Sequence, residues 1–267
     1  MGIRAVICAV YGTLLERGPA PENADSVWTQ VWRSKLNRPP RVSLAEFNRS
    51  ADLALHAETS LATARGVEAP APYWPAVAMQ LLPELREIAS EDVAEFLFTH
   101  AQLRRSVRLT AGAAQALLAL HERGILLGLL CNGHPHTAVE LALALQAPEA
   151  PLEPFLLAGE THEIDPLEAA AQGLEIFTRP LCFWSYSHGF GKPNPHAFQH
   201  VATRLRARGV AVDEVLMVGE TEDGDLKPAR KFGWRTWHLT SDDRDRPSSG
   251  NWAALARKYD LPILAAP

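Results

Sequence analysis

The chain has 267 residues, 47% of them hydrophobic, and a formal net charge of -5. Its length supports a sizeable core in one or two domains, and the acidic balance gives no reason to expect nucleic acid or an anionic membrane as a partner. No apolar run approaches the roughly 20 residues of a membrane-spanning helix, and no signal peptide is recognisable. We therefore expect a cytoplasmic protein in which Cys8, Cys131 and Cys182 are buried free thiols.

The first expected element is a short buried strand, Ile3 to Val10, that runs into a tight turn at Gly12 and Thr13. Residues 17 to 105 then show only helical spacing of apolar residues. This switch from a strand pattern to a long helical block predicts a helical domain inserted after the first strand.

Individual residues within the block indicate where its helices begin and end. Asn23 can cap a first helix, Ser43-Leu44-Ala45-Glu46 is a capping box for a second, and Gly66 ends that helix. Two further helices are expected over Trp74 to Leu85, with a break at Pro83, and over Ser90 to Leu103. Trp28, Trp32 and Trp74 recur at helical spacing and are expected in the core of the block or at its contact with the rest of the chain.

Helices and strands alternate from Thr110 onward, where Thr110 caps a helix that ends at Gly124. Strands are expected over Ile125 to Cys131, Leu181 to Ser185, Glu214 to Val218 and Arg235 to Leu239. Helices are expected up to Leu145, over Pro195 to Arg208 and up to Phe232. Continuous apolar strands are typical of a parallel sheet covered on both faces. The order predicts an α/β fold, a Rossmann-like doubly wound parallel sheet whose site lies at the carboxyl ends of the strands.

Four of these strand ends carry recognisable motifs. They are Ala9-Val10-Tyr11-Gly12-Thr13-Leu14, Cys131-Asn132-Gly133, Gly191-Lys192-Pro193-Asn194-Pro195, and Gly219-Glu220 with Asp223-Gly224-Asp225. In this order they resemble the haloacid dehalogenase (HAD) superfamily, whose C1 cap lies where this chain has its helical block. The resemblance implies a HAD-like Rossmannoid core of residues 1–16 and 106–267 and a helical C1 cap of residues 17–105.

The resemblance also implies residue roles, and this chain departs from several of them. The nucleophilic aspartate corresponds to Ala9, whose methyl group cannot attack an electrophile, hold a metal or move a proton. Tyr11 stands at the general acid/base position of the phosphatase branch, and Lys192 matches the lysine of the third motif. Cys131 replaces a serine or threonine and is a weaker hydrogen-bond donor.

The fourth motif keeps its acidic character but changes one residue, because Glu220 replaces an aspartate while Asp225 matches a second acid. The family's Mg²⁺ would need the missing carboxylate at position 9, and Mg²⁺ demands near-ideal octahedral geometry. We therefore expect Mg²⁺ at Glu220 and Asp225 to be weak or absent. The expected ligand is a small anionic molecule. The residues expected to hold it are Gly12, Thr13, Cys131, Asn132, Gly133 and Lys192.

Plain structural explanations compete with these roles. Lys192 can be a solvated turn lysine, and the acidic residues near Glu220 can form a solvated loop. Cys131 lies near His134 and His136, which hints at thiol chemistry, but histidines at a loop-to-helix boundary are more often surface residues.

Three functions follow. The leading one is a HAD-like hydrolase relative that has lost covalent catalysis, a pseudoenzyme that retains a ligand-binding pocket; several independent departures from the pattern favour it. The second is a genuine phosphatase or 2-haloacid dehalogenase in which the nucleophile was changed to alanine. The third is a non-catalytic interaction scaffold that uses the helical block or residues Ala147 to Thr178, an expected insertion near the site mouth.

Overall fold

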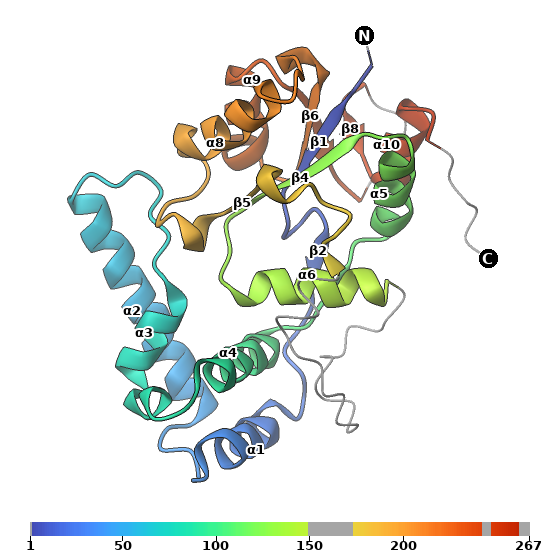
Figure 1. Ribbon diagram of the computed structural model, residues 1–267. Coiled ribbons are helices and arrows are strands. Elements are labelled where there is room, and N and C mark those ends of the chain that lie inside the picture. Colours follow the sequence, from blue (N-terminus) through green and yellow to red (C-terminus); the bar gives the residue numbers. More distant parts are fainter. Residues whose placement is uncertain (1, 149–172, 242–246, 262–267) are drawn as a thin grey trace.

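A parallel β-sheet dominates the computed structural model, which describes residues 2–148, 173–241 and 247–261. Its strands lie in the order β5-β4-β1-β6-β7-β8, and every neighbouring pair is parallel (Figure 1). The strands are β1 (Ala5–Cys8), β4 (Leu126–Cys131), β5 (Cys182–Trp184), β6 (Val215–Gly219), β7 (Arg235–Leu239) and β8 (Ser249–Gly250). The predicted α/β fold with a Rossmann-like parallel sheet is confirmed.

Helices cover both faces of the sheet because alternate residues of β1 point to opposite sides and are all buried. Val6 and Cys8 pack into the cluster that contains helices α5 (Ala113–Glu122) and α10 (Trp252–Lys258). Ala5, Ile7 and Ala9 pack into the cluster that contains α8 (Pro195–Arg206) and α9 (Lys227–Lys231). The sheet and these helices are called the sheet unit below.

A second group of helices lies between β2 and β3 in the chain and below the sheet in Figure 1. It consists of α1 (Ala24–Leu36), α2 (Leu44–Ala64), α3 (Trp74–Leu81), a 3-10 turn at Pro83–Arg86, and α4 (Ser90–Arg104). This helical unit has its own buried cluster, which includes Trp28, Trp32 and Trp74 as predicted. Trp28 stacks on Phe47 with ring centroids 5.3 Å apart. The 3-10 turn confirms the expected break at Pro83.

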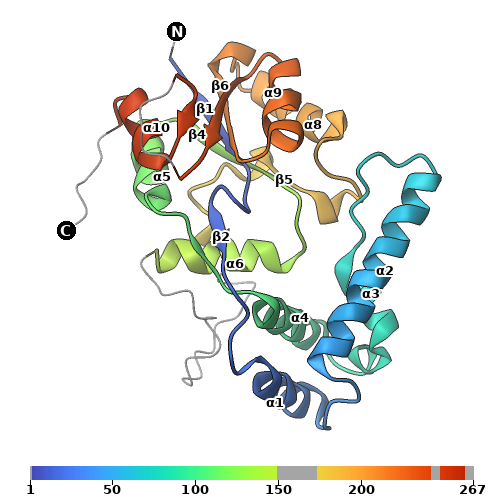
Figure 2. The same cartoon turned by 180° about the vertical axis from the view of Figure 1, so that it is seen from behind.

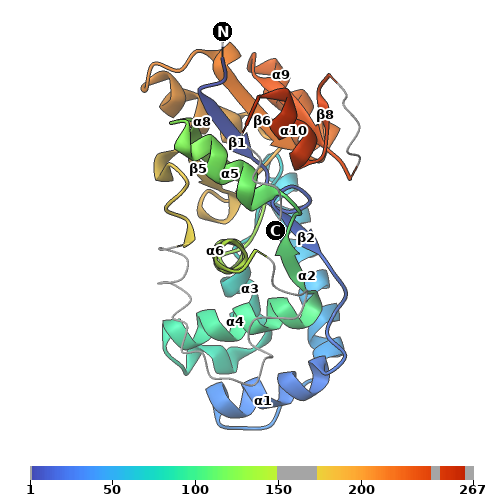
Figure 3. The ribbon, with the colours of Figure 1, turned by 90° about the vertical axis from the view of Figure 1, so that its right-hand side faces the viewer.

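Two short strands join the units. β2 (Leu15–Arg17) and β3 (Val107–Leu109) form an antiparallel pair that the sequence patterns did not predict. Helix α6 (His136–Gln146) lies between the sheet and the helical unit, as Figure 3 shows. One side of α6 therefore faces the strand ends while another faces α3 and α4.

Some expected boundaries are wrong. Helix α5 begins at Ala113, after Gly112 with φ +79°, and not at Thr110. The Thr110 carbonyl accepts the Ala113 amide in a turn, and within the described residues its hydroxyl caps nothing. The expected insertion, Ala147 to Thr178, lies outside the described residues over positions 149–172. No helix in the described ranges is long and apolar enough to cross a lipid bilayer.

We expect Ser43→Ala to lower the free energy of unfolding by about 1 kcal/mol, because it removes the capping box of α2. The Ser43 hydroxyl accepts the Glu46 amide at 3.2 Å, and the Glu46 carboxylate accepts the Ser43 amide at 2.9 Å. Asn23→Ala is the matched control, because Asn23 is the N-cap residue of α1 but its side chain makes no capping bond. Urea denaturation measures both, and equal losses would contradict the assignment.

Candidate functional site

The site lies at the carboxyl ends of β1, β4, β5 and β6. Because the strands are parallel, these ends meet at one edge of the sheet, and that edge faces α6 and the helical unit (Figures 1 and 2). Cys131 is the last residue of β4, and the other site residues predicted from the strand ends follow one of these strands. The structure brings some of their side chains into contact and turns others away from one another.

Lys192 and Asp225 form an ion pair at the centre of this edge, and their side chains are only 9% and 5% exposed. The second carboxylate oxygen of Asp225 accepts hydrogen bonds from the amide and hydroxyl of Thr221, at 3.0 and 2.7 Å. Burial raises the pKa of Asp225, but the Lys192 ammonium and these hydrogen bonds outweigh it and the pKa is lowered. Lys192 is therefore not a solvated turn lysine, and a carboxylate already balances its charge.

Asn132 positions the backbone of the Lys192 loop. Its side-chain amide donates to the Lys192 carbonyl at 2.8 Å and accepts the Lys192 amide at 2.7 Å. A Cβ on Gly191 would lie 2.2 Å from the Asn132 oxygen, so only glycine permits this approach. The second and third motifs are thus joined through the backbone.

The first motif has few exposed polar groups. Ala9 is 2% exposed and packs in the apolar cluster under α8, while its amide donates to Val218 at 2.9 Å. The amide of Gly12 donates to Leu15 at 2.8 Å, and Gly12 has φ +71°. The hydroxyl of Thr13 is buried and has no hydrogen-bond partner among the described residues.

Glu220 lies over the turn of the first motif instead of pairing with Lys192. Its carboxylate occupies the space in which a Cβ on Gly12 would sit, with an oxygen 1.0 Å from that position. The residue is exposed. Two constraints therefore favour glycine at position 12: its left-handed backbone conformation and the carboxylate above it.

Ser185, which the sequence analysis did not single out as a site residue, forms hydrogen bonds with the backbone of the second motif. The Gly133 amide donates to the Ser185 hydroxyl at 3.1 Å, and that hydroxyl donates back to the Gly133 carbonyl at 3.2 Å. Cys131 is 1% exposed, and burial raises the pKa of its thiol to about 12. The thiol is therefore protonated at neutral pH, which argues against a role as nucleophile.

Tyr11 points toward α6. Its hydroxyl bonds the Thr137 hydroxyl at 3.0 Å and donates to the Glu140 carboxylate. The guanidinium groups of Arg17 and Arg105 lie over its ring, 4.3 and 4.8 Å from the centroid. Burial and the neighbouring Glu140 charge raise the pKa of Tyr11, so the phenol keeps its proton.

Glu140 is a fully buried carboxyl group that the sequence analysis did not single out. Burial raises its pKa, although Arg105 and the Tyr11 hydrogen bond act in the opposite direction. One carboxyl oxygen has no partner among the described residues. The available signal was an acidic residue in the otherwise apolar run Val139 to Leu145.

The expectation that His134 and His136 are surface residues is wrong. His136 is 8% exposed, and His134 is half-buried with its ring 6.2 Å from Trp74 of the helical unit. Burial lowers the pKa of His136 and takes that of His134 to about 4. Packing of the helical unit on the start of α6 therefore keeps both rings neutral at pH 7.

The described residues fit a magnesium ion poorly. They hold no cluster of three or more histidine, cysteine, aspartate or glutamate side chains arranged for a metal. The Ala9 side chain has no oxygen, both carboxylate oxygens of Asp225 are engaged, and Glu220 lies over Gly12. An octahedral shell of oxygen ligands would require these contacts to break.

Comparison with known proteins bears on the fold and the family. A family model described as a haloacid dehalogenase-like hydrolase matches residues 3–233. The crystal structure of 2-haloacid dehalogenase from Pseudomonas syringae pv. Tomato DC3000 is similar with a TM-score of 0.53 and 19% identity, over 97% of this chain and 98% of that chain. A search of curated proteins gave no match.

Two other solved structures have lower TM-scores. The putative HAD-hydrolase YfnB from Bacillus subtilis, described as bound to magnesium, has a TM-score of 0.49 and 16% identity over 98% of this chain and 100% of that chain. The L-2-haloacid dehalogenase from Xanthobacter autotrophicus has a TM-score of 0.44 and 20% identity over 96% and 81%. At such identities these likenesses concern the fold alone.

We expect Glu140→Gln to change the pH dependence of stability. A carboxyl group with a raised pKa binds its proton more tightly when folded, so its contribution to stability falls as pH rises through the unfolded value toward the folded one. Glutamine removes this loss and still accepts the Tyr11 hydrogen bond. The free energy of unfolding of the variant, relative to the unmodified protein, should therefore rise as the pH increases above about 4, near which a free glutamate titrates.

Denaturant unfolding at several pH values measures this difference. Glu122→Gln, at an exposed glutamate of α5, is the control and should show no such trend. Parallel pH profiles for Glu140→Gln and the unmodified protein would show that folding does not raise the pKa of Glu140.

Proposed function

Since the chain belongs to the haloacid dehalogenase-like hydrolase family, we propose that it is a catalytically impaired member that retains a weak binding pocket for a small anion. In this proposal the helical unit is a C1-type cap of residues 17–105 on a core of residues 1–16 and 106–267. The observation that carries the proposal is Ala9, a buried methyl group at the end of the central strand β1.

Three groups at the strand ends that could replace the missing nucleophile are already engaged or protonated. Asp225 is held by Lys192 and Thr221, the Cys131 thiol is protonated, and the carboxyl of Glu140 is bound to Tyr11. A covalent ester requires an activated and accessible nucleophile. Loss of the aspartate therefore removes covalent catalysis in this proposal.

The same geometry supports a weak anion pocket. Lys192 brings a cation to the strand ends, and the absence of a carboxylate at position 9 removes a repulsive charge from the same place. The balancing charge of Asp225 works against a second anion, so the proposed affinity is millimolar. Mg²⁺ binding is proposed to be weak or absent, because both carboxylate oxygens of Asp225 are engaged and the Glu220 carboxylate lies over Gly12.

We expect negligible turnover of phosphate esters and 2-haloacids, with or without Mg²⁺, because no carboxylate is available to form the covalent intermediate. Ala9→Asp alone should restore little activity, since Cys131 and Glu220 still differ from the family pattern and Lys192 is already paired. Steady-state assays of phosphate or halide release measure both proteins.

Thermal unfolding of Ala9→Asp is the control, because it separates a folded but inactive variant from an unfolded one. Activity that purifies with the unmodified protein would contradict the proposal. Robust rescue by Ala9→Asp would instead favour the second hypothesis, a genuine hydrolase that carries an altered nucleophile.

Anion binding is expected to depend on the balance between Lys192 and Asp225. Asp225→Asn frees the lysine charge and should strengthen phosphate or sulfate binding roughly threefold to tenfold. Lys192→Met combined with Asp225→Asn should abolish binding without leaving an unpaired buried charge. Calorimetric titration at low ionic strength measures the affinities.

The matched control is Lys227→Met with Asp223→Asn, which removes an exposed ion pair of the same residue types. Its anion affinity should equal that of the unmodified protein. If the Lys192 and Asp225 variants bind phosphate equally, or if no variant binds it at millimolar concentrations, the strand ends do not form an anion pocket.

A further inference from the structure

A cavity of about 470 Å³ lies between the helical unit and α6. Its walls come from α3, the 3-10 turn Pro83–Arg86, α4 and the first turns of α6. Figure 3 shows α6 between the sheet and the helical unit. Most of the lining is apolar and includes Trp74, Met79, Leu85, Val93, Leu97 and Val139. Its volume falls within the range of about 300–1,000 Å³ that small-molecule sites occupy.

This cavity is separate from the strand ends. None of the residues that surround Lys192 and Asp225 lines it. Helix α6 stands between the two places: Thr137 and Glu140 bond Tyr11, whereas His136 and Val139 line the cavity. Nothing in the proposed strand-end function uses the cavity.

His136 is the buried polar group of the cavity wall. The residue is only 8% exposed, and its imidazole makes no hydrogen bond to any described residue. Burial and the neighbouring positive groups lower its pKa, so the ring is neutral at pH 7. A neutral imidazole offers one donor and one acceptor to a ligand.

Arg86 is the charged group of the wall. It is exposed, so it marks the open end, and it makes no hydrogen bond or ion pair with any residue in the described part of the chain. A guanidinium group with unused donors is suited to a carboxylate, which it can bind through two parallel hydrogen bonds.

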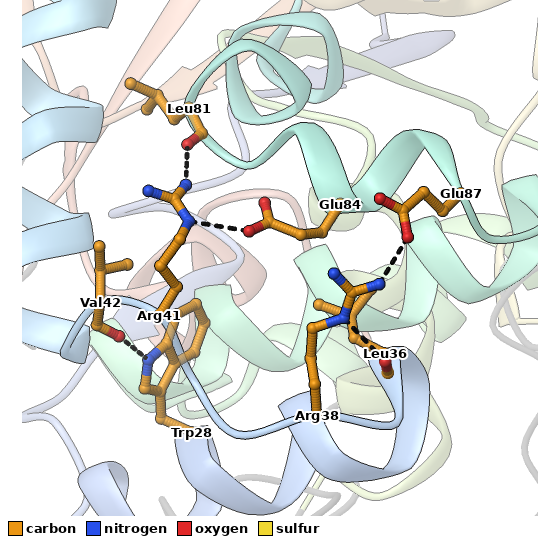
Figure 4. A network of polar contacts seen from close by, with 8 residues as sticks. All are labelled: Trp28, Leu36, Arg38, Arg41, Val42, Leu81, Glu84 and Glu87. Atoms are coloured by element: carbon orange, nitrogen blue, oxygen red, sulfur yellow. Dashed lines mark hydrogen bonds and ion pairs between the residues drawn. The ribbon is translucent and has the colours of Figure 1, made fainter.

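The short turn that bears Arg86 is held by its neighbours, as Figure 4 shows. Arg41 donates to the Glu84 carboxylate at 2.8 Å and to the Leu81 carbonyl at 3.1 Å. Arg38 forms an ion pair with Glu87, the residue that follows Arg86 in the chain. The backbone at Arg86 is therefore fixed on both sides while its own side chain has no protein partner among the described residues.

We propose that this cavity binds a small amphipathic carboxylate, with an apolar aryl or branched alkyl body inside and its carboxylate at Arg86. Burial of the apolar body supplies most of the affinity, and the guanidinium selects the anion. A sugar phosphate does not fit, because its hydroxyl groups would lose water against apolar walls without gaining hydrogen bonds. An occupant contacts the helical unit and α6 and stabilises their packing.

The probe is 4-phenylbutyrate, and 4-phenylbutanol is its neutral counterpart. Calorimetry and thermal unfolding of the full chain measure binding of each. Ala94→Phe places a ring at an exposed lining position, and Arg86→Gln removes the charge. Ala64→Phe and Arg65→Gln are matched controls at exposed positions of the helical unit outside the cavity.

The acid is expected to bind at sub-millimolar concentration, to raise the unfolding temperature and to bind more tightly than the alcohol. Arg86→Gln should weaken the acid roughly threefold to tenfold and leave the alcohol unchanged. Ala94→Phe should weaken both, and the controls neither. Lack of binding, equal binding of acid and alcohol, or full binding to Ala94→Phe would overturn the proposal. Lys192→Met with Asp225→Asn should bind the acid normally, so this result is independent of the strand-end anion pocket.

Discussion

The buried ion pair between Lys192 and Asp225 is the constraint on which the strand-end geometry depends. Two charges that are almost fully removed from water must pair with each other, and removing one partner alone leaves an uncompensated charge that is strongly destabilising. The pair fixes the loop after β5 against the loop after β6, and Asn132 attaches the loop after β4 to the same lysine. The interaction that organises the site also neutralises its cation.

Helix α6 connects this edge to the helical unit. One of its sides holds Tyr11 through Thr137 and Glu140, and another lines the cavity with His136 and Val139. Residues four apart lie on one helical face, so Glu140 and His136 would share a side in an ideal helix. His136, however, is the first residue of α6, and it lines the cavity with its ring 5.4 Å from that of His134. A movement of α6 would therefore change contacts both at the strand ends and in the cavity.

Local patterns in the sequence predicted the elements well. Continuous apolar runs marked β4 and β6, and Pro83 broke a helix because proline lacks the backbone donor. The pairing of β2 with β3 was not predictable in this way, since strands of three residues show no clear alternation. Burial of His134 and His136 depends on α4, which packs on α6 from far along the chain, and the partner of Lys192 lies 33 positions away. Such contacts have no local signal.

The cations at the two places where a ligand could sit differ in their partners. At the strand ends Lys192 is bound to Asp225, Gly133 to Ser185 and Tyr11 to Glu140. A ligand there must displace contacts that already stabilise the fold, which limits its net gain in free energy. In the cavity, the unpartnered Arg86 and His136 face apolar walls, and a ligand would add contacts without breaking any. In our two proposals, therefore, the cavity binds its carboxylate more tightly than the strand ends bind a small anion.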